Sequence, residues 1–198
     1  MKKLLSLNFL VFAFAAGNCQ QKYGLRSGAN IATIKGLTGF PKNRLGWYAG
    51  LFFEQPLNSN FFMHLETAYT TKGMKVGNTL NNSNFVFRFN YISIPILVGY
   101  NLDKRTSILA GLEGSYNTSV KWIVDNDLNL DRSDYYPRKV DAGVCVGINY
   151  DILKRLSADV RYVYGFMTIY NVDDAGIRYS EKEAGNRVFQ IGISYNLK

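Results

Sequence analysis

Residues 91–100 have the sequence Tyr91-Ile-Ser-Ile-Pro-Ile-Leu-Val-Gly-Tyr100, and their alternation decides the fold class. Successive side chains of a β-strand point to opposite faces, so the even-numbered residues here form one apolar face. That face consists of Ile92, Ile94, Ile96, Val98 and Tyr100. The other face is mixed and contains Pro95, which has no N–H to donate to a neighbouring strand. The stretch therefore predicts a strand with a continuous apolar face.

The same alternation recurs from residue 22 to the end of the chain and predicts eight strands. They are expected at residues 22–34, 45–57, 61–71, 85–100, 107–120, 139–150, 156–167 and 187–198. Long polar connections at 35–43, 72–84, 121–138 and 171–186 alternate with short ones at 58–60, 101–106 and 151–155. In an up-and-down arrangement all the long loops therefore leave one end, and both ends of the strand region lie at the other.

The face opposite the apolar residues carries many glycines and most of the charged side chains of the strands. These are Arg26, Glu54, His64, Glu66, Glu113, Asp141, Asp159 and Arg161. A soluble, lipocalin-like barrel would turn its apolar face inward, and alternation alone does not separate that case from an inverted one. Loop asymmetry, an N-terminal export segment, and Tyr or Trp near the strand ends favour inversion. The prediction is an all-β, eight-stranded antiparallel transmembrane barrel.

The N-terminus has the pattern of a secretory signal peptide. Met1-Lys-Lys is positively charged, residues 4–16 are mostly apolar, and small residues follow. We expect a signal peptide at 1–19, with cleavage near Cys19 or Gln20, and a barrel domain at 20–198 in the outer membrane. Lipid attachment at Cys19 is an alternative, although Asn18 is bulky where such sites need a small residue.

The chain carries a formal net charge of +8, but its basic residues are scattered. Nucleic-acid binding needs a clustered basic patch or a recognisable module, and neither is present in the sequence. Attraction to an anionic membrane surface explains the charge more simply. We therefore expect outer-membrane lipid and the barrel-assembly machinery as partners, and no nucleic acid.

Several segments resemble the PorT-like family of outer-membrane barrels. Residues 91–100 are similar to its Tyr-x-x-Ile-Pro-Leu-Leu-x-x-Tyr signature, and residues 22–30, 110–115, 141–147 and 161–165 are similar to other parts of the family. The resemblance implies a small eight-stranded barrel in the outer membrane of a Gram-negative bacterium and implies no enzymatic activity. One departure is the C-terminus, which ends Tyr195-Asn-Leu-Lys198 instead of on an aromatic residue.

An eight-stranded barrel is just wide enough for its own side chains, so the inward charges are expected to form a lumenal network of ion pairs. A narrow ion path is the functional alternative. His64, the only histidine in the sequence, lies near Glu66 on the same face, as a catalytic base and its orienting carboxylate would. No Gly-x-Ser-x-Gly nucleophile motif accompanies the pair. Residues 125–131 alternate oxygen ligands, yet Leu130 replaces the glycine of a calcium loop. We expect no cofactor, no metal and no catalytic residues.

The function favoured by the sequence is a non-enzymatic barrel that presents its loops to another envelope component, in secretion or envelope assembly. Trp122, Tyr135 and Tyr136 in the third long loop are the interaction candidates, because aromatic residues dominate interfaces. The alternative for them is a place in the aromatic girdle at headgroup level. A narrow porin-like channel and a lipid-modifying enzyme are the other candidate functions.

The apolar positions change parity upstream of the opening stretch. Phe85, Phe87, Phe89 and Tyr91 are odd-numbered, whereas the apolar residues from Ile92 onward are even-numbered. One inserted residue reverses every later side chain, so the pattern predicts either a β-bulge between Asn90 and Ser93 or a strand that rises above the membrane there. In both cases Pro95 is expected to face the lumen.

Overall fold

The computed structural model describes residues 21–35, 41–77, 84–124, 128–131, 139–167 and 185–198. The strands are β1 (Lys22–Lys35), β2 (Pro41–Pro56), β3 (Phe61–Gly77), β4 (Asn84–Asn101), β5 (Thr106–Val124), β6 (Leu128–Asp131), β7 (Val140–Leu153), β8 (Leu156–Gly165) and β9 (Gly185–Asn196). No helix among these residues is long and apolar enough to cross a membrane.

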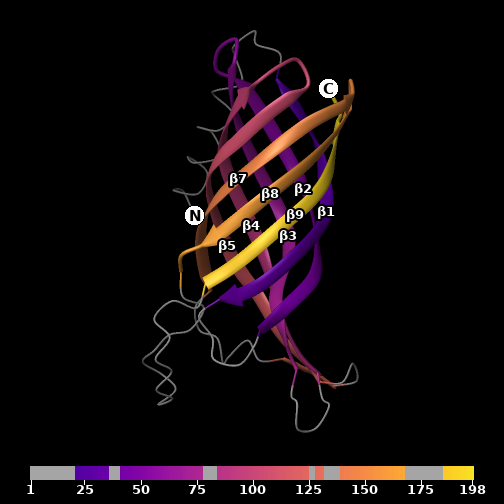
Figure 1. Ribbon diagram of the computed structural model, residues 1–198, viewed down its shortest axis with the longest axis vertical. Helices are drawn as coiled ribbons and strands as arrows, with labels where there is room; N and C mark the ends of the chain where they lie inside the picture. Colours follow the sequence, from indigo (N-terminus) through magenta and orange to yellow (C-terminus); the bar gives the residue numbers. More distant parts are fainter. Residues whose placement is uncertain (1–20, 36–40, 78–83, 125–127, 132–138, 168–184) are drawn as a thin grey trace, which may run out of the picture.

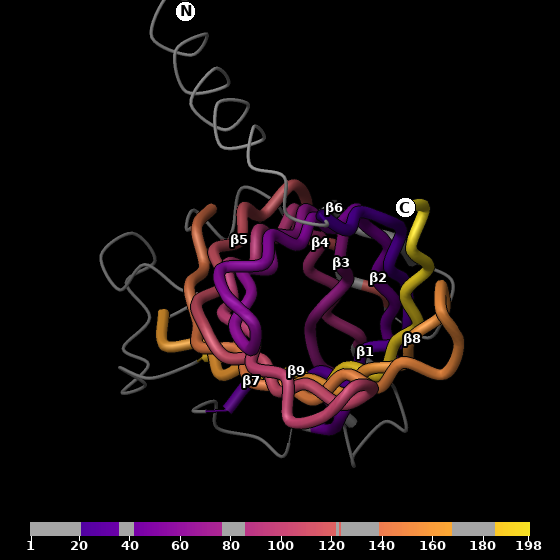
Figure 2. The backbone as a smooth tube through the Cα atoms, turned by 90° about the horizontal axis from the view of Figure 1, so that it is seen from above, coloured from indigo at the N-terminus to yellow at the C-terminus, as the bar shows by residue number. Residues whose placement is uncertain are grey.

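Eight of the strands close into an antiparallel barrel (Figures 1 and 2). Each pairs with its neighbours in sequence, β6 aside, and β1 pairs with β9 to complete the ring. Closure leaves no free edge along the barrel wall, as a strand structure in lipid requires. β6 pairs with β5 alone, on the edge of β5 that β7 occupies nearer the turn end, and is not one of the eight strands of the ring. The predicted eight-stranded up-and-down barrel is confirmed, with β6 as an addition inside the expected third loop.

Short turns at one end of the barrel are held by side chains that accept backbone hydrogen bonds. Asn58 Oδ1 accepts from the backbone N–H of Asn60 and of Phe61. Asp103 Oδ1 accepts from the N–H of Arg105 at 2.7 Å and of Thr106 at 2.8 Å. These backbone hydrogen bonds lower the pKa of Asp103. This end, which also holds the start of β1 and the end of β9, is called the turn end below, and the opposite end the loop end.

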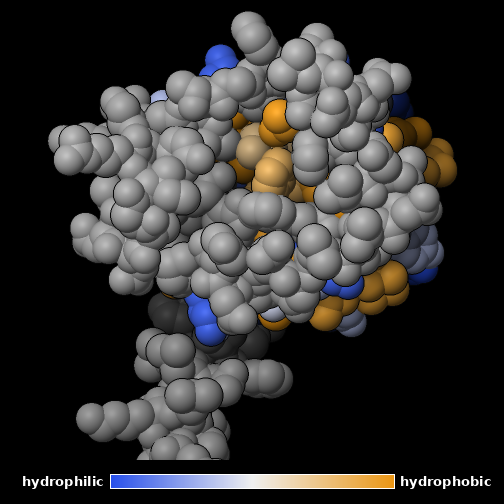
Figure 3. All heavy atoms as spheres, turned by 90° about the horizontal axis from the view of Figure 1, so that it is seen from below, coloured by the Kyte–Doolittle hydropathy of each residue, from blue (hydrophilic) through white to orange (hydrophobic). Residues whose placement is uncertain are grey.

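The outer wall is a band of exposed apolar side chains bounded by aromatic rings. Ile92, Ile94, Ile96 and Val98 of β4 are 43–54% exposed, and the other strands repeat the pattern. Hydrophobic residues are visible along the wall in the view from the loop end (Figure 3). Two ring pairs mark the borders of the band. Phe61 and Tyr100 lie 4.9 Å apart, by centroid, at the turn end, and Trp47 and Tyr69 lie 5.5 Å apart toward the loop end.

The membrane-spanning segments lie between these two aromatic borders, and three strands continue beyond them. On β3 the borders are Phe61 and Tyr69, which matches the roughly 9–11 tilted residues that cross a bilayer. However, β3, β4 and β5 are 17, 18 and 19 residues long. Residues 70–77, 84–91 and 117–124, together with β6, therefore stand above the loop-end border. We call them the loop-side extension.

This extension explains the parity change on β4. Phe89 and Tyr91 are buried on the same face as Pro95, so β4 does not reverse its sides. A register shift does lie beside Asn90, but the extra residue is Thr118 of β5. The predicted β-bulge within β4 is therefore wrong, and the alternative, a strand that rises above the membrane, is what the structure shows. The prediction that Pro95 faces the lumen is confirmed.

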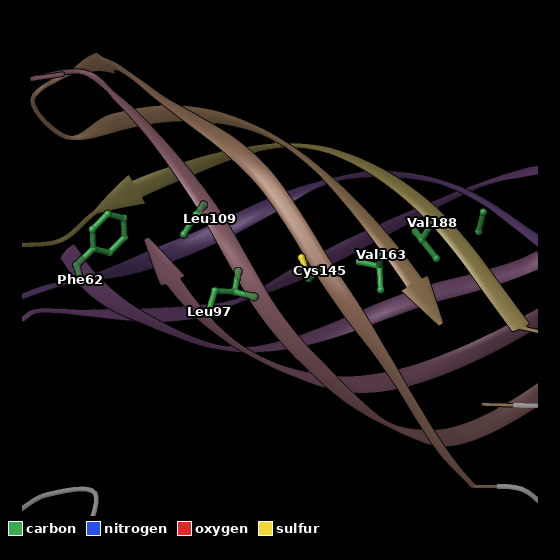
Figure 4. Packing of buried hydrophobic residues seen from close by; sticks show 7 residues of the cluster. Phe62, Leu97, Leu109, Cys145, Val163 and Val188 are labelled. Atoms are coloured by element: carbon green, nitrogen blue, oxygen red, sulfur yellow. The ribbon is translucent and has the colours of Figure 1, made fainter. Parts of the chain in front are cut away.

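Two apolar clusters lie inside the barrel. One, at the loop end, consists of Ile34, Met74, Phe89, Tyr91 and Val120, and we call it the aromatic seal. Its members are at most 4% exposed. The second lines the inner wall from the turn end inward and includes Phe62, Leu97, Leu109, Cys145, Val163 and Val188 (Figure 4). The lumen is therefore partly apolar, with apolar clusters beside the expected inward charges.

Candidate functional site: the barrel lumen

Four charged side chains form a compact network in the middle of the lumen. Arg26 of β1 contacts Glu66 of β3 at 3.0 Å and donates from Nε to Asp159 of β8 at 2.9 Å. A second Arg26 nitrogen also contacts Asp159. Arg161 of β8 donates to the other oxygen of Glu66 at 2.8 Å. All four residues are 2–3% exposed. Two cations face two carboxylates, so the buried charges balance, as a low-dielectric interior demands.

His64 joins this network to the turn end. Its Nδ1 lies 3.0 Å from Glu54 Oε1, and its Nε2 lies 3.3 Å from an Arg161 guanidinium nitrogen. Nε2 also lies 3.4 Å from Glu66 Oε2, so it contacts a carboxylate as well as the guanidinium. The ring also stacks on Phe52, with centroids 5.5 Å apart. Both ring nitrogens are therefore occupied by structural partners.

A second network lies between the first one and the aromatic seal. Lys72 Nζ donates to Glu113 at 2.7 Å and to Ser115 at 3.3 Å, and it lies 3.9 Å from Asp141. Asn186 donates to the same Asp141 oxygen at 2.7 Å. The Lys72 ammonium also sits 5.1 Å from the centre of the Tyr91 ring in the seal. The second network and the aromatic seal are therefore in direct contact through this cation–π interaction.

A cavity of about 240 Å³ lies at the turn end of the lumen. Its inner part is lined by His64, Arg161, Phe52, Phe62 and Leu109, and its outer part by residues of the turns. Among the residues that the structure describes, no group of three or more His, Cys, Asp or Glu side chains could hold a metal ion.

The predicted lumenal residues fall into these two groups. Arg26, Glu54, His64, Glu66, Asp159 and Arg161 meet in the first network, and Glu113 and Asp141 meet in the second.

The predicted interaction residues lie mostly outside the described part of the chain. Trp122 belongs to β5, where its backbone pairs with Phe87, and its side chain is outside the described part. Tyr135 and Tyr136 lie outside the described residues.

A comparison of the sequence with known families agrees with the barrel fold. A family model described as outer membrane protein beta-barrel domain matches residues 18–171. The chain belongs to this family. Its place in the cell is therefore the outer membrane.

Solved outer membrane β-barrels share the fold at low sequence identity. Neisserial surface protein A is 13% identical with a TM-score of 0.60, over 87% of this chain and 96% of that one. Ail, the attachment invasion locus protein of Yersinia pestis, is 15% identical with a TM-score of 0.52, over 90% and 99%. These likenesses show the barrel fold alone. No protein of curated function matches the sequence.

Sequence reasoning on this outer membrane barrel missed two kinds of lumenal residue. Tyr48, whose ring lies 4.3 Å from the Arg26 guanidinium, was on the inward face but carried no charge to attract attention. Phe89 and Tyr91 looked like lipid-facing residues because they are aromatic. The signal that could have identified them is their odd parity, which they share with Ser93 and Pro95.

Proposed function

We propose that this protein is a non-enzymatic outer-membrane barrel that holds its loop-side extension above the membrane for interaction with another envelope protein. The PorT-like resemblance suggests secretion or envelope assembly as the setting. Export by the N-terminal signal peptide and insertion by the barrel-assembly machinery, with outer-membrane lipid around the barrel, are part of the same proposal.

The observation that carries this proposal is the contrast between the lumen and the extension. The lumen holds two buried ion networks and the aromatic seal, so its side chains are committed to one another. The extension, in contrast, lengthens β3, β4 and β5 well past the apolar band. A barrel whose role was confined to the membrane would not need strand residues beyond the apolar band. Ail, a barrel of this fold, was solved in complex with a heparin analogue, so binding of a further molecule is compatible with the architecture.

Affinity purification from outer membranes tests the proposed interaction. The combined variant Trp122→Ala, Tyr135→Ala and Tyr136→Ala is expected to lose a partner that the unchanged protein retains, because aromatic residues contribute most to interface affinity. Leu102→Ala is the matched control, since Leu102 is an exposed apolar residue at the turn end. Retention of every co-purifying protein by the triple variant would overturn the proposal.

A narrow passive channel is the second candidate, and the cavity at the turn end is what favours it. This cavity reaches inward to His64 and Arg161, so water and ions could enter that far from the turn side. Transport would then require the side chains of the first network and the aromatic seal to move apart. Eight-stranded barrels are generally filled by their own side chains, which weighs against this candidate.

A lipid-modifying enzyme receives less support. The described partners of His64 are carboxylates, a guanidinium and an aromatic ring, and none of these is a hydroxyl or thiol nucleophile. Nucleophilic catalysis needs a nucleophile and a base in contact. Among the described contacts of His64, the nucleophile is absent.

A further inference from the structure

One short sequence pattern recurs where β4, β7 and β9 reach the turn end (Figure 1). It reads Tyr100-Asn-Leu-Asp-Lys-Arg105 after β4, Tyr150-Asp-Ile-Leu-Lys-Arg155 after β7 and Tyr195-Asn-Leu-Lys198 after β9. Each stretch has a tyrosine, then Asn or Asp, then Leu or Ile, and it ends on one or two basic residues. We call these stretches the turn-end segments.

Backbone hydrogen bonds place the three segments side by side. The second residue of each segment donates its N–H, at 2.8 Å, to the carbonyl oxygen of the residue just before the neighbouring strand. The pairs are Asn101 with Asn60, Asp151 with Arg105, and Asn196 with Arg155. Arg105 therefore lies against the second segment, and Arg155 lies against the third. The segments form one continuous arc along the rim of the barrel from β4 to β9.

The third residue of each segment extends the outer apolar face past the turn-end tyrosines. Leu102, Ile152 and Leu197 have the parity of the exposed apolar residues on their strands, and they are 45–56% exposed. Each lies two residues beyond the tyrosine of its segment. Aromatic residues of a barrel mark the headgroup level, so these side chains reach lipid at the border between acyl chains and headgroups.

Five basic side chains end the segments, and all of them are exposed. We call them the basic arc: Lys104, Arg105, Lys154, Arg155 and Lys198. The acidic side chains at this end are already bound within the chain. Asp103 accepts from its own turn, Asp151 accepts from Ser157 at 2.7 Å, and Glu54 contacts His64. Residues 1–20 contain no Asp or Glu, and the other stretches outside the described part join strand ends at the loop end. The arc therefore carries an excess of positive charge.

The turn geometry does not require these cations. Asn60 in the β2–β3 turn holds the place of Arg105 and Arg155, because its carbonyl oxygen accepts the equivalent hydrogen bond. That turn, Asn58-Ser-Asn60, carries no charge. Clustered Lys and Arg beside a membrane are attracted to anionic headgroups. Short turns of outer-membrane barrels face the periplasm, so the headgroups at this level belong to the inner leaflet.

We propose that the basic arc binds the headgroups of anionic phospholipids in the inner leaflet of the outer membrane. Leu102, Ile152 and Leu197 then lie against the acyl chains of the bound lipids. Lys104 and Arg105 also line the cavity at the turn end, so the site begins at the mouth of the lumen and continues along the wall. This lipid site does not depend on the partner proposed for the loop-side extension.

The test uses the full mature chain in nanodiscs of phosphatidylcholine, with and without phosphatidylglycerol. Lipids retained by the released barrel are counted by native mass spectrometry, and the midpoint of thermal unfolding is measured in parallel. We expect phosphatidylglycerol to be retained in preference to phosphatidylcholine and to raise the midpoint. The preference should fall at high salt, because ions screen attraction between exposed charges.

Two double variants each remove the cations of one segment. They are Lys104→Gln with Arg105→Gln, and Lys154→Gln with Arg155→Gln. Phosphatidylglycerol binding is expected to weaken about fivefold for each cation removed. Lys42→Gln with Lys75→Gln is the matched control and should leave binding unchanged. These two lysines are exposed and pair in register at the loop end, well beyond the aromatic border.

A gain of binding guards against a folding defect in the double variants. Ser59→Lys with Asn60→Arg copies the Lys-Arg pair into the uncharged β2–β3 turn and is expected to strengthen phosphatidylglycerol binding. Equal retention by the unchanged protein and both glutamine variants would overturn the proposal. It would also be overturned if polyglutamate bound through the basic arc and phosphatidylglycerol did not, since the arc would then fit an acidic periplasmic protein.

Discussion

Arg26 and Asp159 are 133 residues apart in the chain and form a two-point ion pair inside the barrel. Arg26 stands on the first strand and Asp159 on β8, with β9 between them. The pair therefore crosses the seam where the two ends of the sheet meet. It exists only when β1 pairs with β9, so it couples the electrostatics of the lumen to closure of the barrel.

Breaking this pair is expected to destabilise the barrel strongly. Asp159→Ala leaves Arg26 buried with one carboxylate, and loss of one partner from a buried ion pair costs about 3–5 kcal/mol of unfolding free energy. Urea titration of the protein in detergent micelles measures the change. Lys154→Ala, in the exposed turn before β8, should change stability by no more than about 0.5 kcal/mol. A loss below about 1 kcal/mol for Asp159→Ala would contradict the structural role of the network.

The β4–β5 turn is expected to contribute a pH-dependent stabilisation through Asp103. Its pKa is lowered in the folded protein by the backbone N–H groups of Arg105 and Thr106. The contribution is therefore present above the ordinary aspartate pKa, about 3.9, and is lost as the pH falls through the lower folded value. Asp103→Ala should lower the thermal midpoint at pH 7, and the difference from the unchanged protein should shrink toward pH 2. A difference that does not depend on pH would show that the carboxylate charge is not involved.

His64 is expected to be dispensable for lipid chemistry. Both ring nitrogens already contact partners of the first network, so His64→Ala should alter stability and leave the outer-membrane lipid profile unchanged. Mass spectrometry of lipids from cells with and without the variant gives the readout. Disappearance of a modified lipid in the His64→Ala strain would revive the enzyme alternative. Phe52→Leu, which removes the stacking partner alone, is the control for packing.

The sequence predicted the barrel because alternation in strands is a local property with a fixed period of two. The apolar face of residues 92–100 could be assigned from the local sequence alone. The same holds for the charged residues next to Leu25 and Val160, which have the opposite parity and so lie on the other face. Arg26, Glu66 and Asp159 could likewise be assigned to the lumen by parity. Which of them would form pairs depended on the register between strands distant in sequence, and parity carries no information on that register.

The parts of the loop-side extension on β3 and β5 were not predicted, for a different reason. Residues 72–77 and 121–124 were assigned to loops, because polar sequences beyond the apolar band are typical of loops. In the structure they are strand residues. The polar side chain of Lys72, for example, donates to Glu113 at 2.7 Å and to Ser115 at 3.3 Å. These contacts between distant residues overrode the local preference, as β-propensity often is overridden by context.

Single-channel recording in planar bilayers tests most directly whether the lumen of the barrel is blocked to ions. The unchanged protein, shown to be folded by its heat-modifiable migration on a gel, is expected to be electrically silent, because the buried networks and the aromatic seal fill the lumen. The variant Phe89→Ala with Tyr91→Ala removes both rings of the aromatic seal, including the one that contacts Lys72, and tests whether this layer blocks the path. Its silence would place the block in the ion networks. Discrete, reproducible conductance steps from the unchanged protein would contradict the account and favour a channel.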